Sequence, residues 1–420
     1  IVHKYGGTSM GSVERIQNVA KRVAKWMRAG HQVVVVPSAM SGETNRLLGL
    51  AKDINPNASP RELDQIASTG EQVSSGLLAL ALLREGVDAV SYAGWQVTVH
   101  TDSSFTKARI KSIDDKKILA DLNAGRAVVV TGFQGVDPNG NITTLGRGGS
   151  DTSAVAMAAA LKADECQIYT DVDGVYTADP RQIPSAKKLD YIDVESMLEL
   201  AAAGAKILHI RAVEFARRHN VDLRVRSTFS TDPGTIVYSG KAGAGMEESV
   251  VSGVAVDKGQ TKIMVIGIPD VPGKAADLFT VVADAGANID MIVQNTPTGS
   301  DVVDAVSDIG FTLPKSDTKK VVAALEANKD KLGFRVVEVD EEIGKLSVVG
   351  AGMRTHSGVS ATLFSALAKA GINIEMISTS EIRISVITSD DQVEAAARAV
   401  HTAFGLDSEI EAVVYAGTGR

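Results

Sequence analysis

An internal repeat constrains the fold of this chain more than any other feature. Residues 271–295 (VPGKAADLFTVVADAGANIDMIVQN) align with residues 356–380 (HSGVSATLFSALAKAGINIEMISTS), with glycine, Leu-Phe, Ala-Gly, Asn-Ile and Met-Ile at equivalent places. The apolar runs before them, at 262–267 and 345–350, also match, with two additional residues in the second connecting loop. Such self-similarity predicts two copies of one small structural unit.

Each copy predicts a strand, a glycine-containing loop, a helix, an Ala-Gly turn and a second strand. Further strand and helix patterns follow at 308–312 and 319–328 in the first copy, and at 382–387 and 393–404 in the second. The resulting order, β-α-β-β-α-β, is that of a ferredoxin-like sandwich. Neither copy carries a nucleophile, a metal-binding cluster or an acid–base pair, so we expect binding or assembly from this part of the chain.

The first 230 residues alternate short apolar runs with helical periodicity, which predicts an α/β domain with a largely parallel sheet. The predicted strands are 2–5, 33–36, 127–131, 167–171 and 223–225, and the predicted helices are 13–28, 72–84, 151–163, 194–203 and 211–218. Small residues from Tyr238 to Gly245 predict a linker. We therefore expect a first domain over 1–237, a linker over 238–248 and two repeat regions over 249–340 and 341–420.

Composition excludes several function classes. The net charge is −8, from 43 basic and 51 acidic residues, and aromatic residues make up 4%, so we expect no nucleic-acid partner. Cys166 is the only cysteine, which excludes an intramolecular disulfide and fits a reducing compartment. No apolar run approaches the roughly 18 residues of a membrane span. We expect a cytoplasmic protein without a membrane partner.

The segment TLGRGGSDTSAVAMAAALKA, residues 144–163, is the strongest chemical signal. Its glycines allow the backbone to approach a ligand closely, and Ser150 or Asp151 can cap the helix that follows, leaving N–H groups at a positively polarised end. Arg147 adds a guanidinium suited to a carboxylate or a phosphate. An ordinary glycine-rich turn before a helix cap is the alternative interpretation.

A second glycine-rich turn follows the first predicted strand, at Lys4–Ser9, with Ser12 as the expected cap of the next helix. A lysine beside two glycines suits a phosphate, and loops at the carboxyl ends of parallel strands converge on one crevice. Neither turn is a P-loop, and no complete GxGxxG follows a strand.

Other polar residues have two interpretations. Ser68–Glu71 matches a capping box, in which Glu71 bonds the helix start, yet the same carboxylate could hold a substrate ammonium. Lys206 could be a solvated lysine, and the acidic residues of 171–179 could decorate a long turn. The seven histidines show no metal-binding spacing, so we expect no protein-held metal.

Seven segments in order resemble the bacterial aspartokinase family, over essentially the whole chain. They are KYGGTS (4–9), VVVVPSAMSGETN (33–45), STGEQ (68–72), TTLGRGGSDTSA (143–154), TDVDGVYTADPR (170–181), GAKILH (204–209) and RVRSTFSTDPGT (224–235). The resemblance implies an α/β fold: an amino acid kinase-type (carbamate kinase-like) three-layer α/β/α domain followed by two ferredoxin-like ACT domains. One departure lies at 304–308, where relatives show a clearer strand.

The resemblance also implies a reaction, the phosphorylation of the aspartate side-chain carboxylate by ATP with Mg²⁺, at the head of lysine, threonine and methionine synthesis. A carboxylate is already a nucleophile, so the site needs cations and amides to bring two anions together rather than a general base. Magnesium is expected on ATP oxygens. Another amino acid kinase, acting on glutamate or N-acetylglutamate, and a non-catalytic sensor of nucleotide and amino acid stay open.

By resemblance, Lys4 contacts the transferring phosphate and Asp151 orients that lysine. Arg147 binds the substrate carboxylate and Glu71 its ammonium. The implied substrate-binding residues are Thr44, Glu71, Arg147, Gly148, Gly149 and Ser150. The implied ATP-binding residues are Lys4, Tyr5, Gly6, Gly7, Ser38, Thr170, Asp171, Tyr176, Asp179, Pro180, Arg181 and Lys206.

ACT domains of this family bind end-product amino acids, so the resemblance implies lysine and/or threonine as effectors. The implied effector residues of the first copy are Asp270, Gly273, Ala275, Asn288, Ile289, Asp290 and Gln294, and those of the second are Met353, Gly358, Val359, Asn373, Ile374, Glu375 and Thr379. A homo-oligomer through exposed ACT sheet edges is expected. A shorter regulatory chain starting near Met246 is a further hypothesis.

Overall fold

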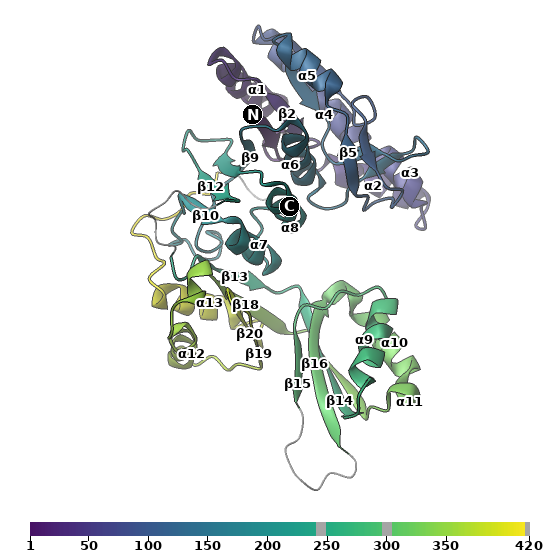
Figure 1. Cartoon of the computed structure of the whole chain (residues 1–420), viewed down its shortest axis with the longest axis vertical. Helices are drawn as coiled ribbons and strands as arrows, with labels where there is room; N and C mark the ends of the chain where they lie inside the picture. Colours follow the sequence, from purple (N-terminus) through teal and green to yellow (C-terminus); the bar gives the residue numbers. More distant parts are fainter. Residues whose placement is uncertain (241–248, 296–304, 416–420) are drawn as a thin grey trace. The chain divides into compact units, whose positions relative to one another are not determined.

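The computed structural model describes residues 1–240, 249–295 and 305–415, and it divides into two compact units (Figure 1). The first unit contains residues 1–202 and 206–240 together with the C-terminal residues 408–415. The second unit contains residues 203–205 and the described part of 249–407. Most of the expected linker, including Met246, lies outside the described residues.

The first unit is built on an eight-stranded sheet with the order β10-β12-β11-β9-β1-β2-β6-β3. The strands are β1 (Val2–Tyr5), β2 (Val34–Pro37), β3 (Ala89–Tyr92), β6 (Ala127–Val130), β9 (Cys166–Thr170), β10 (Tyr191–Asp193), β11 (Leu223–Ser227) and β12 (Thr235–Tyr238). Every pairing in this sheet is parallel except that of β11 with β12. The prediction of a largely parallel sheet is confirmed.

Helices cover both faces of this sheet. They are α1 (Val13–Arg28), α2 (Glu43–Ile54), α3 (Pro60–Ala67), α4 (Thr69–Arg84), α5 (Lys116–Asn123), α6 (Gly149–Leu161), α7 (Val194–Ala202) and α8 (Ile210–His219). One buried cluster joins α1 and α4 to Tyr5, Val35 and Val129, which point to one side of their strands. The alternate positions, Lys4 among them, point to the side of α6.

A second, smaller sheet with the order β5-β4-β7-β8 was not predicted. Its strands are β4 (Val99–Thr101), β5 (Ile110–Ile113), β7 (Gln134–Val136) and β8 (Ile142–Thr144). These strands are only three or four residues long, so no alternating pattern could reveal them. The adjoining helical stretch Pro60–Arg84 is long and apolar enough to span a membrane, but half of its most apolar window is buried inside the domain, as expected of a core helix.

The second unit contains two four-stranded sheets, each covered by helices. The first repeat runs β14 (Gln260–Pro269), α9 (Lys274–Asp284), β15 (Ile292–Asn295), β16 (Val306–Pro314), α10 (Thr318–Ala327), α11 (Lys329–Leu332) and β17 (Val336–Asp340). Its sheet order is β15-β16-β14-β17, so the β-α-β-β-α-β prediction is confirmed for this repeat. The segment after residue 304 forms a long strand, β16, despite its weak sequence signal.

Up to residue 415, where the described part of the chain ends, the second repeat has no last strand of this pattern after its second helix. It runs β18 (Ile343–Val349), α12 (Val359–Lys369), β19 (Met376–Thr379), β20 (Arg383–Ser389) and α13 (Val393–Ala403). Its fourth strand is β13 (Gly253–Asp257), which pairs with β18 in the order β13-β18-β20-β19. A division of the repeats at residue 341 therefore does not follow the sheets. Because β13 fills the edge, residues 408–415 are free to pack elsewhere.

Two reciprocal ion pairs join the repeats. Lys345 of β18 bonds Asp290, while Lys262 of β14 bonds Glu375. The two lysines occupy equivalent positions of the repeat, as do the two carboxylates, and Met291 and Met376 meet in a small apolar cluster between them. The repeat is thus a local two-fold arrangement held by its own equivalent residues.

We expect Lys345→Met to lower the free energy of unfolding of the second unit by about 1–3 kcal/mol, because it leaves the Asp290 carboxylate without its cation. Lys262→Met is the matched control. Its side chain is 17% exposed against 1% for Lys345, so the loss should be smaller. Calorimetric unfolding of both variants measures the difference, and equal losses would contradict the prediction.

Candidate active site

The loops after β1, β2 and β9, which carry several of the motifs named above, meet at one edge of the large sheet. β1 pairs with β2 and with β9 in parallel, so the turns after these strands lie together. The Ser38 N–H donates to the Tyr5 carbonyl oxygen at 2.9 Å, and the Ser9 and Thr228 hydroxyls lie 2.6 Å apart. The turns after β1, β2 and β11 therefore meet at this edge. The glycine-rich turn before α6 follows β8 of the small sheet instead, and it is joined to the turn after β1 through the Lys4–Asp151 pair described next.

A buried ion pair lies at the centre of this edge. Lys4 Nζ is 2.7 Å from a carboxylate oxygen of Asp151, and each residue is only 5% exposed. Lys4 lies on β1, and Asp151 lies in the first turn of α6. Asp151 balances the charge of Lys4 and fixes its direction, so the ammonium N–H groups and the positive end of the α6 dipole are together suited to a phosphate.

The prediction that Ser150 or Asp151 caps α6 is wrong. The cap position is Gly148, in the left-handed region at φ 67°, and this residue has no side chain that could cap the helix. Asp151 lies three residues after this cap, in the first turn of the helix, where its carboxylate points at Lys4 instead. A Cβ at Gly148 would lie 2.0 Å from the His209 ring, so only glycine fits this turn.

Arg147 is exposed on the loop that leads into α6, four residues before Asp151. Gly149 opens the helix, and a Cβ there would approach the Phe133 ring at 2.7 Å. Ser150 is half-buried, and its side chain lies against Gly132 in the turn after β6. The loop therefore brings the Arg147 guanidinium to the same end of α6 as the Lys4–Asp151 pair.

Glu71 lies buried in the first turn of α4, with 3% of its surface exposed. The capping-box interpretation is wrong, because Ser68 makes no side-chain cap and one oxygen of Glu71 accepts from the Ala39 N–H at 3.2 Å. Its other oxygen, Oε2, has no hydrogen-bond partner among the described residues. Burial raises the pKa of Glu71 to about 8. A buried, half-satisfied carboxyl group of this kind is suited to an incoming cation.

In the turn after β1, backbone groups rather than side chains are available to contact a ligand. A Cβ at Gly6 would lie 3.3 Å from Lys4 Nζ, so glycine keeps space open over the lysine. The Tyr5 side chain is fully buried, stacked on Tyr169, so only its backbone can face a ligand. Gly7 approaches the loop after β2, which holds Ser38, and Thr44 is half-buried at the start of α2.

The expected nucleotide residues lie mostly on the loop after β9. Asp171 and Arg181 form an ion pair of 2.7 Å, and the Arg181 N–H donates to Asp179. Tyr176 is 8% exposed, and burial raises its pKa to about 12. Thr170 donates to Asp171, Pro180 is buried, and Lys206 is exposed in the segment between α7 and α8.

Two residues that position these loops were not predicted. Asp64 of α3 is buried and accepts from the backbone N–H groups of Thr106 and Thr144 and from the Thr144 hydroxyl. Arg211 of α8 donates to the carbonyl oxygens of Leu145 and Ala108, each at 2.6 Å. Their partners lie 42 to 103 residues away, and no local pattern indicates such distant contacts.

The expected effector residues fall into two groups in the first repeat. A cavity of about 310 Å³ at the start of α9 is lined by Asp270, Gly273, Ala275 and Gln294, with Ser307 hydrogen-bonded to Gln294. Asn288 is exposed, Ile289 packs on the core of the repeat, and Asp290 bonds Lys345.

The counterparts in the second repeat are spread in the same way. Gly358 begins α12 at φ 95°, as Gly273 begins α9 at φ 96°, and Val359 is buried in the first turn. Glu375 bonds Lys262. The remaining expected residues are half-buried or exposed around these points: Met353, Asn373, Ile374 and Thr379.

Within residues 1–240, 249–295 and 305–415, no three histidine, cysteine, aspartate or glutamate side chains are arranged to hold a metal ion. The residues at the site fit a metal that arrives on the phosphates of a nucleotide, since Lys4 and the glycine turns leave the phosphate side open and supply no carboxylate cage.

Comparison with known proteins agrees with this architecture. Residues 1–227 match the amino acid kinase family, and residues 263–328 and 346–404 match the ACT domain. The aspartokinase of Pseudomonas aeruginosa is 54% identical over 97% of this chain and 98% of its own length, and that of Corynebacterium glutamicum is 50% identical over 100% and 99%. The crystal structure of E. coli aspartokinase III in complex with aspartate and ADP superposes with a TM-score of 0.80 at 26% identity, covering 96% of this chain and 99% of that one.

The first unit and its buried Lys4–Asp151 pair therefore define an amino acid kinase domain, followed by ACT domains. At this level of identity over the full length, the chain belongs to the aspartokinase family and is an enzyme, a kinase.

Proposed function

We propose that this chain transfers the γ-phosphoryl group of MgATP to the side-chain carboxylate of L-aspartate, giving 4-phospho-L-aspartate and ADP. The observation that carries the proposal is the juxtaposition of the buried Lys4–Asp151 pair with the glycine-rich turns at the carboxyl edge of the sheet. This arrangement would put a phosphate-binding subsite next to an amino-acid-binding subsite. In metabolism the step would begin lysine, threonine and methionine synthesis.

The reaction joins two anions, so the protein's task is to neutralise and orient them. Lys4 would contact the transferring phosphoryl group, with Asp151 fixing the direction of its ammonium. The N-terminal end of the α6 helix dipole adds positive potential. The substrate carboxylate is itself the nucleophile, and it forms a bond to phosphorus as the bond to ADP breaks.

Amino acid recognition would use one cation and one anion. Arg147, exposed at the loop, would bind a substrate carboxylate, and the unsatisfied Oε2 of Glu71 would accept from the ammonium. Thr44 and the turn Gly148–Ser150 would complete the pocket. The Asp171–Arg181 loop and Lys206 would bind the nucleotide.

The test is ATP-dependent formation of an acyl phosphate, trapped with hydroxylamine, in parallel reactions containing aspartate, glutamate and N-acetylglutamate. We expect product with aspartate and a background signal with the other two. Product with glutamate alone would replace the proposal by a different amino acid kinase. A carboxylate at Glu71 favours a free ammonium and so argues against the acetylated substrate.

We further propose that lysine and/or threonine inhibit the enzyme from the ACT repeats. The cavity at the start of α9 supports this, since Asp270 and Gln294 line a volume of amino acid size beside a helix N-terminus. Activity measured with lysine, with threonine and with both distinguishes single from concerted inhibition. No change with any of them would contradict this part of the proposal.

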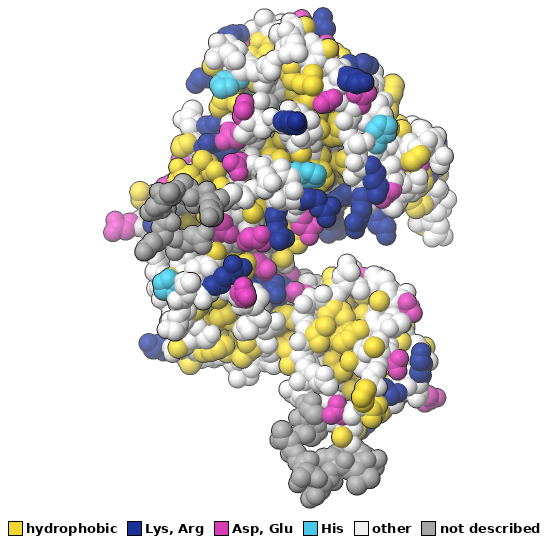
Figure 2. All heavy atoms as spheres, viewed as in Figure 1, with side chains coloured by type: hydrophobic (Ala, Val, Ile, Leu, Met, Phe, Trp, Pro, Cys, Tyr) yellow, Lys and Arg dark blue, Asp and Glu magenta, His cyan; other side chains and the backbone are white. Residues whose placement is uncertain are grey.

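Assembly through the ACT sheets is part of the same proposal. Ile292 of β15 and Ile377 of β19, which are edge strands, are 52% and 44% exposed, and Figure 2 shows hydrophobic side chains gathered on the first repeat. Exposed apolar edges favour pairing with another chain. We propose a homo-oligomer, with a shorter chain beginning near Met246 as an additional partner. We also propose that the protein acts in the cytoplasm, where the free, buried Cys166 would stay reduced.

A further inference from the structure

The C-terminal segment, residues 408–415, packs on the loop that holds the candidate nucleotide residues. Tyr415 N–H donates to the Asp171 carbonyl oxygen at 3.0 Å, and Val414 pairs with Val172 as an antiparallel bridge. Further along the loop, the Ser408 and Ala412 N–H groups donate to the carbonyl oxygens of Ser185 and Pro184 at 2.7 and 2.9 Å. The segment therefore bonds the backbone at the start of the Asp171–Arg181 loop and again three to four residues after its end.

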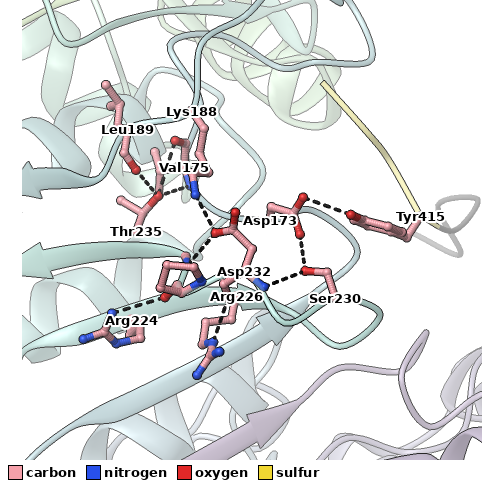
Figure 3. Close-up of polar contacts among 12 residues, drawn as sticks. Asp173, Val175, Lys188, Leu189, Arg224, Arg226, Ser230, Asp232, Thr235 and Tyr415 are labelled. Atoms are coloured by element: carbon pink, nitrogen blue, oxygen red, sulfur yellow. Dashed lines mark hydrogen bonds and ion pairs between the residues drawn. The ribbon is translucent and has the colours of Figure 1, made fainter. Parts of the chain in front are cut away.

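The Tyr415 side chain adds a polar contact at the centre of the loop. Its hydroxyl donates to one carboxylate oxygen of Asp173 at 3.1 Å, and the Ser230 hydroxyl bonds the other oxygen (Figure 3). The Tyr415 ring also stacks on Phe229, with 6.3 Å between the centroids. Asp173 is thus held between the C-terminal segment and the turn that follows β11.

The turn after β11, residues 228–232, is itself rigidly supported. Arg22 of α1 donates to the carbonyl oxygens of Thr228 and Ser230, at 2.9 and 2.7 Å. The Arg226 guanidinium donates to the Asp232 carbonyl oxygen, and the Asp232 carboxylate accepts from Lys188 (Figure 3). Arg22 and Arg226 also line a cavity of about 710 Å³, but their guanidinium groups are already bonded to the turn. The turn therefore gives Tyr415 a fixed surface to bind.

We propose that the C-terminal segment, through Tyr415, positions the Asp171–Arg181 loop for nucleotide binding. Between β9 and β10, where every residue is described, no helix or strand forms, and the later part of the loop is held by a bridge from Tyr176 to Lys188 with the backbone hydrogen bonds beside it. The segment supplies the corresponding bridge for the first part of the loop, at Val172.

Without the segment, the Asp171 carbonyl oxygen loses the Tyr415 N–H and one oxygen of Asp173 loses the Tyr415 hydroxyl, while Ser230 still bonds the other oxygen. Part of the free energy of nucleotide binding must then be spent on ordering the loop. This inference rests on the proposed function, in which Asp171 and Arg181 bind the nucleotide.

The place of the segment in the chain adds a regulatory consequence. Residues 404–407 alone separate α13, the last helix of the second ACT repeat, from residue 408. A conformational change of the second repeat on binding an amino acid would displace the segment through this short connection. The displacement would alter the nucleotide loop without involving the substrate-binding residues. The segment would then carry inhibition as a loss of nucleotide affinity.

Four full-length or near full-length variants test this. One chain ends at Asp407, one carries Tyr415→Ala and one carries Tyr415→Phe, which keeps the ring but removes the bond to Asp173. Ile410→Ala is the matched control, because Ile410 lies in the same segment and is 79% exposed. For each variant we would measure MgADP affinity by calorimetry without aspartate, the KM values for ATP and aspartate, and the thermal unfolding temperature.

We expect the truncated chain and Tyr415→Ala to weaken MgADP binding about tenfold and to raise the KM for ATP similarly, with the KM for aspartate and the unfolding temperature unchanged. Tyr415→Phe should weaken binding about threefold, and Ile410→Ala should match the wild type. Unchanged MgADP affinity in the truncated chain would overturn the inference. If the wild type itself bound no MgADP, the proposed function would fail instead, so the two failures are distinguishable.

Discussion

Replacing Lys4 by methionine is expected to lower kcat by about 10³-fold or more while MgADP affinity changes less than tenfold. Lys4 is the buried cation that would face the transferring phosphoryl group and stabilise the charge that its three equatorial oxygens share in the transition state. A loss of this size corresponds to about 4 kcal/mol of transition-state stabilisation. Steady-state kinetics and calorimetric MgADP binding together measure the split between catalysis and binding.

The obvious complication is stability, because Lys4→Met leaves the Asp151 carboxylate buried without its cation. The double variant Lys4→Met with Asp151→Asn removes both charges and should unfold near the wild-type temperature, yet stay as inactive as the single variant. Lys25→Met, at an exposed position of α1, serves as the control. A single variant that keeps more than about a tenth of wild-type kcat would show that Lys4 does not act on the phosphoryl group.

The layered fold could be predicted because its signals are local. The core strands are short apolar runs, and α1 begins at Val13 with Ser12 as its cap, as the pattern predicts. The ACT repeats were visible because the chain repeats itself. The small sheet β5-β4-β7-β8 has no such signal, since its strands are short and paired through contacts distant in sequence.

The site was predicted by residue type better than by local geometry. Lys4 and Asp151 meet as the family resemblance implies, but the helix-cap role expected for Asp151 was wrong, because Gly148 takes the cap position in a conformation that only glycine adopts easily. Glu71 satisfied a capping-box spacing and still bonds Ala39, on a different loop. Spacing defines what a side chain can reach locally, whereas burial decides which partner it takes.

The contacts of residues 408–415 were beyond prediction for a related reason. The repeat pattern predicts a final strand in the second ACT domain, and the sequence does not show that β13, about 150 residues earlier, already fills that edge. Once the edge is occupied, the remaining backbone groups need other partners, and the loop after β9 supplies them.

Glu71→Gln is expected to raise the KM for aspartate by about 100-fold and, unusually for a site variant, to stabilise the protein at pH 8. Burial raises the pKa of Glu71 to about 8, far above its value in an unfolded chain. Between roughly pH 4.5 and 8 the folded protein keeps a proton that the unfolded chain has lost, so this group lowers stability as the pH rises through that window. Glutamine does not titrate, so Glu71→Gln removes this pH-dependent loss of folding free energy.

The stabilisation by Glu71→Gln should therefore be absent near pH 4.5, grow up to about pH 8 and stay constant above it, which thermal unfolding across pH measures as a rising difference of several degrees. The wild-type KM for aspartate should fall over the same window, because an ionised Glu71 is the partner of the substrate ammonium, and the variant should lose this pH dependence. Glu62→Gln, at an exposed glutamate of α3, is the control and should alter neither property. If the KM of Glu71→Gln for aspartate follows the wild-type pH profile, the substrate ammonium binds elsewhere. If Glu71→Gln and the wild type are equally stable at pH 8, Glu71 is ionised in the empty site.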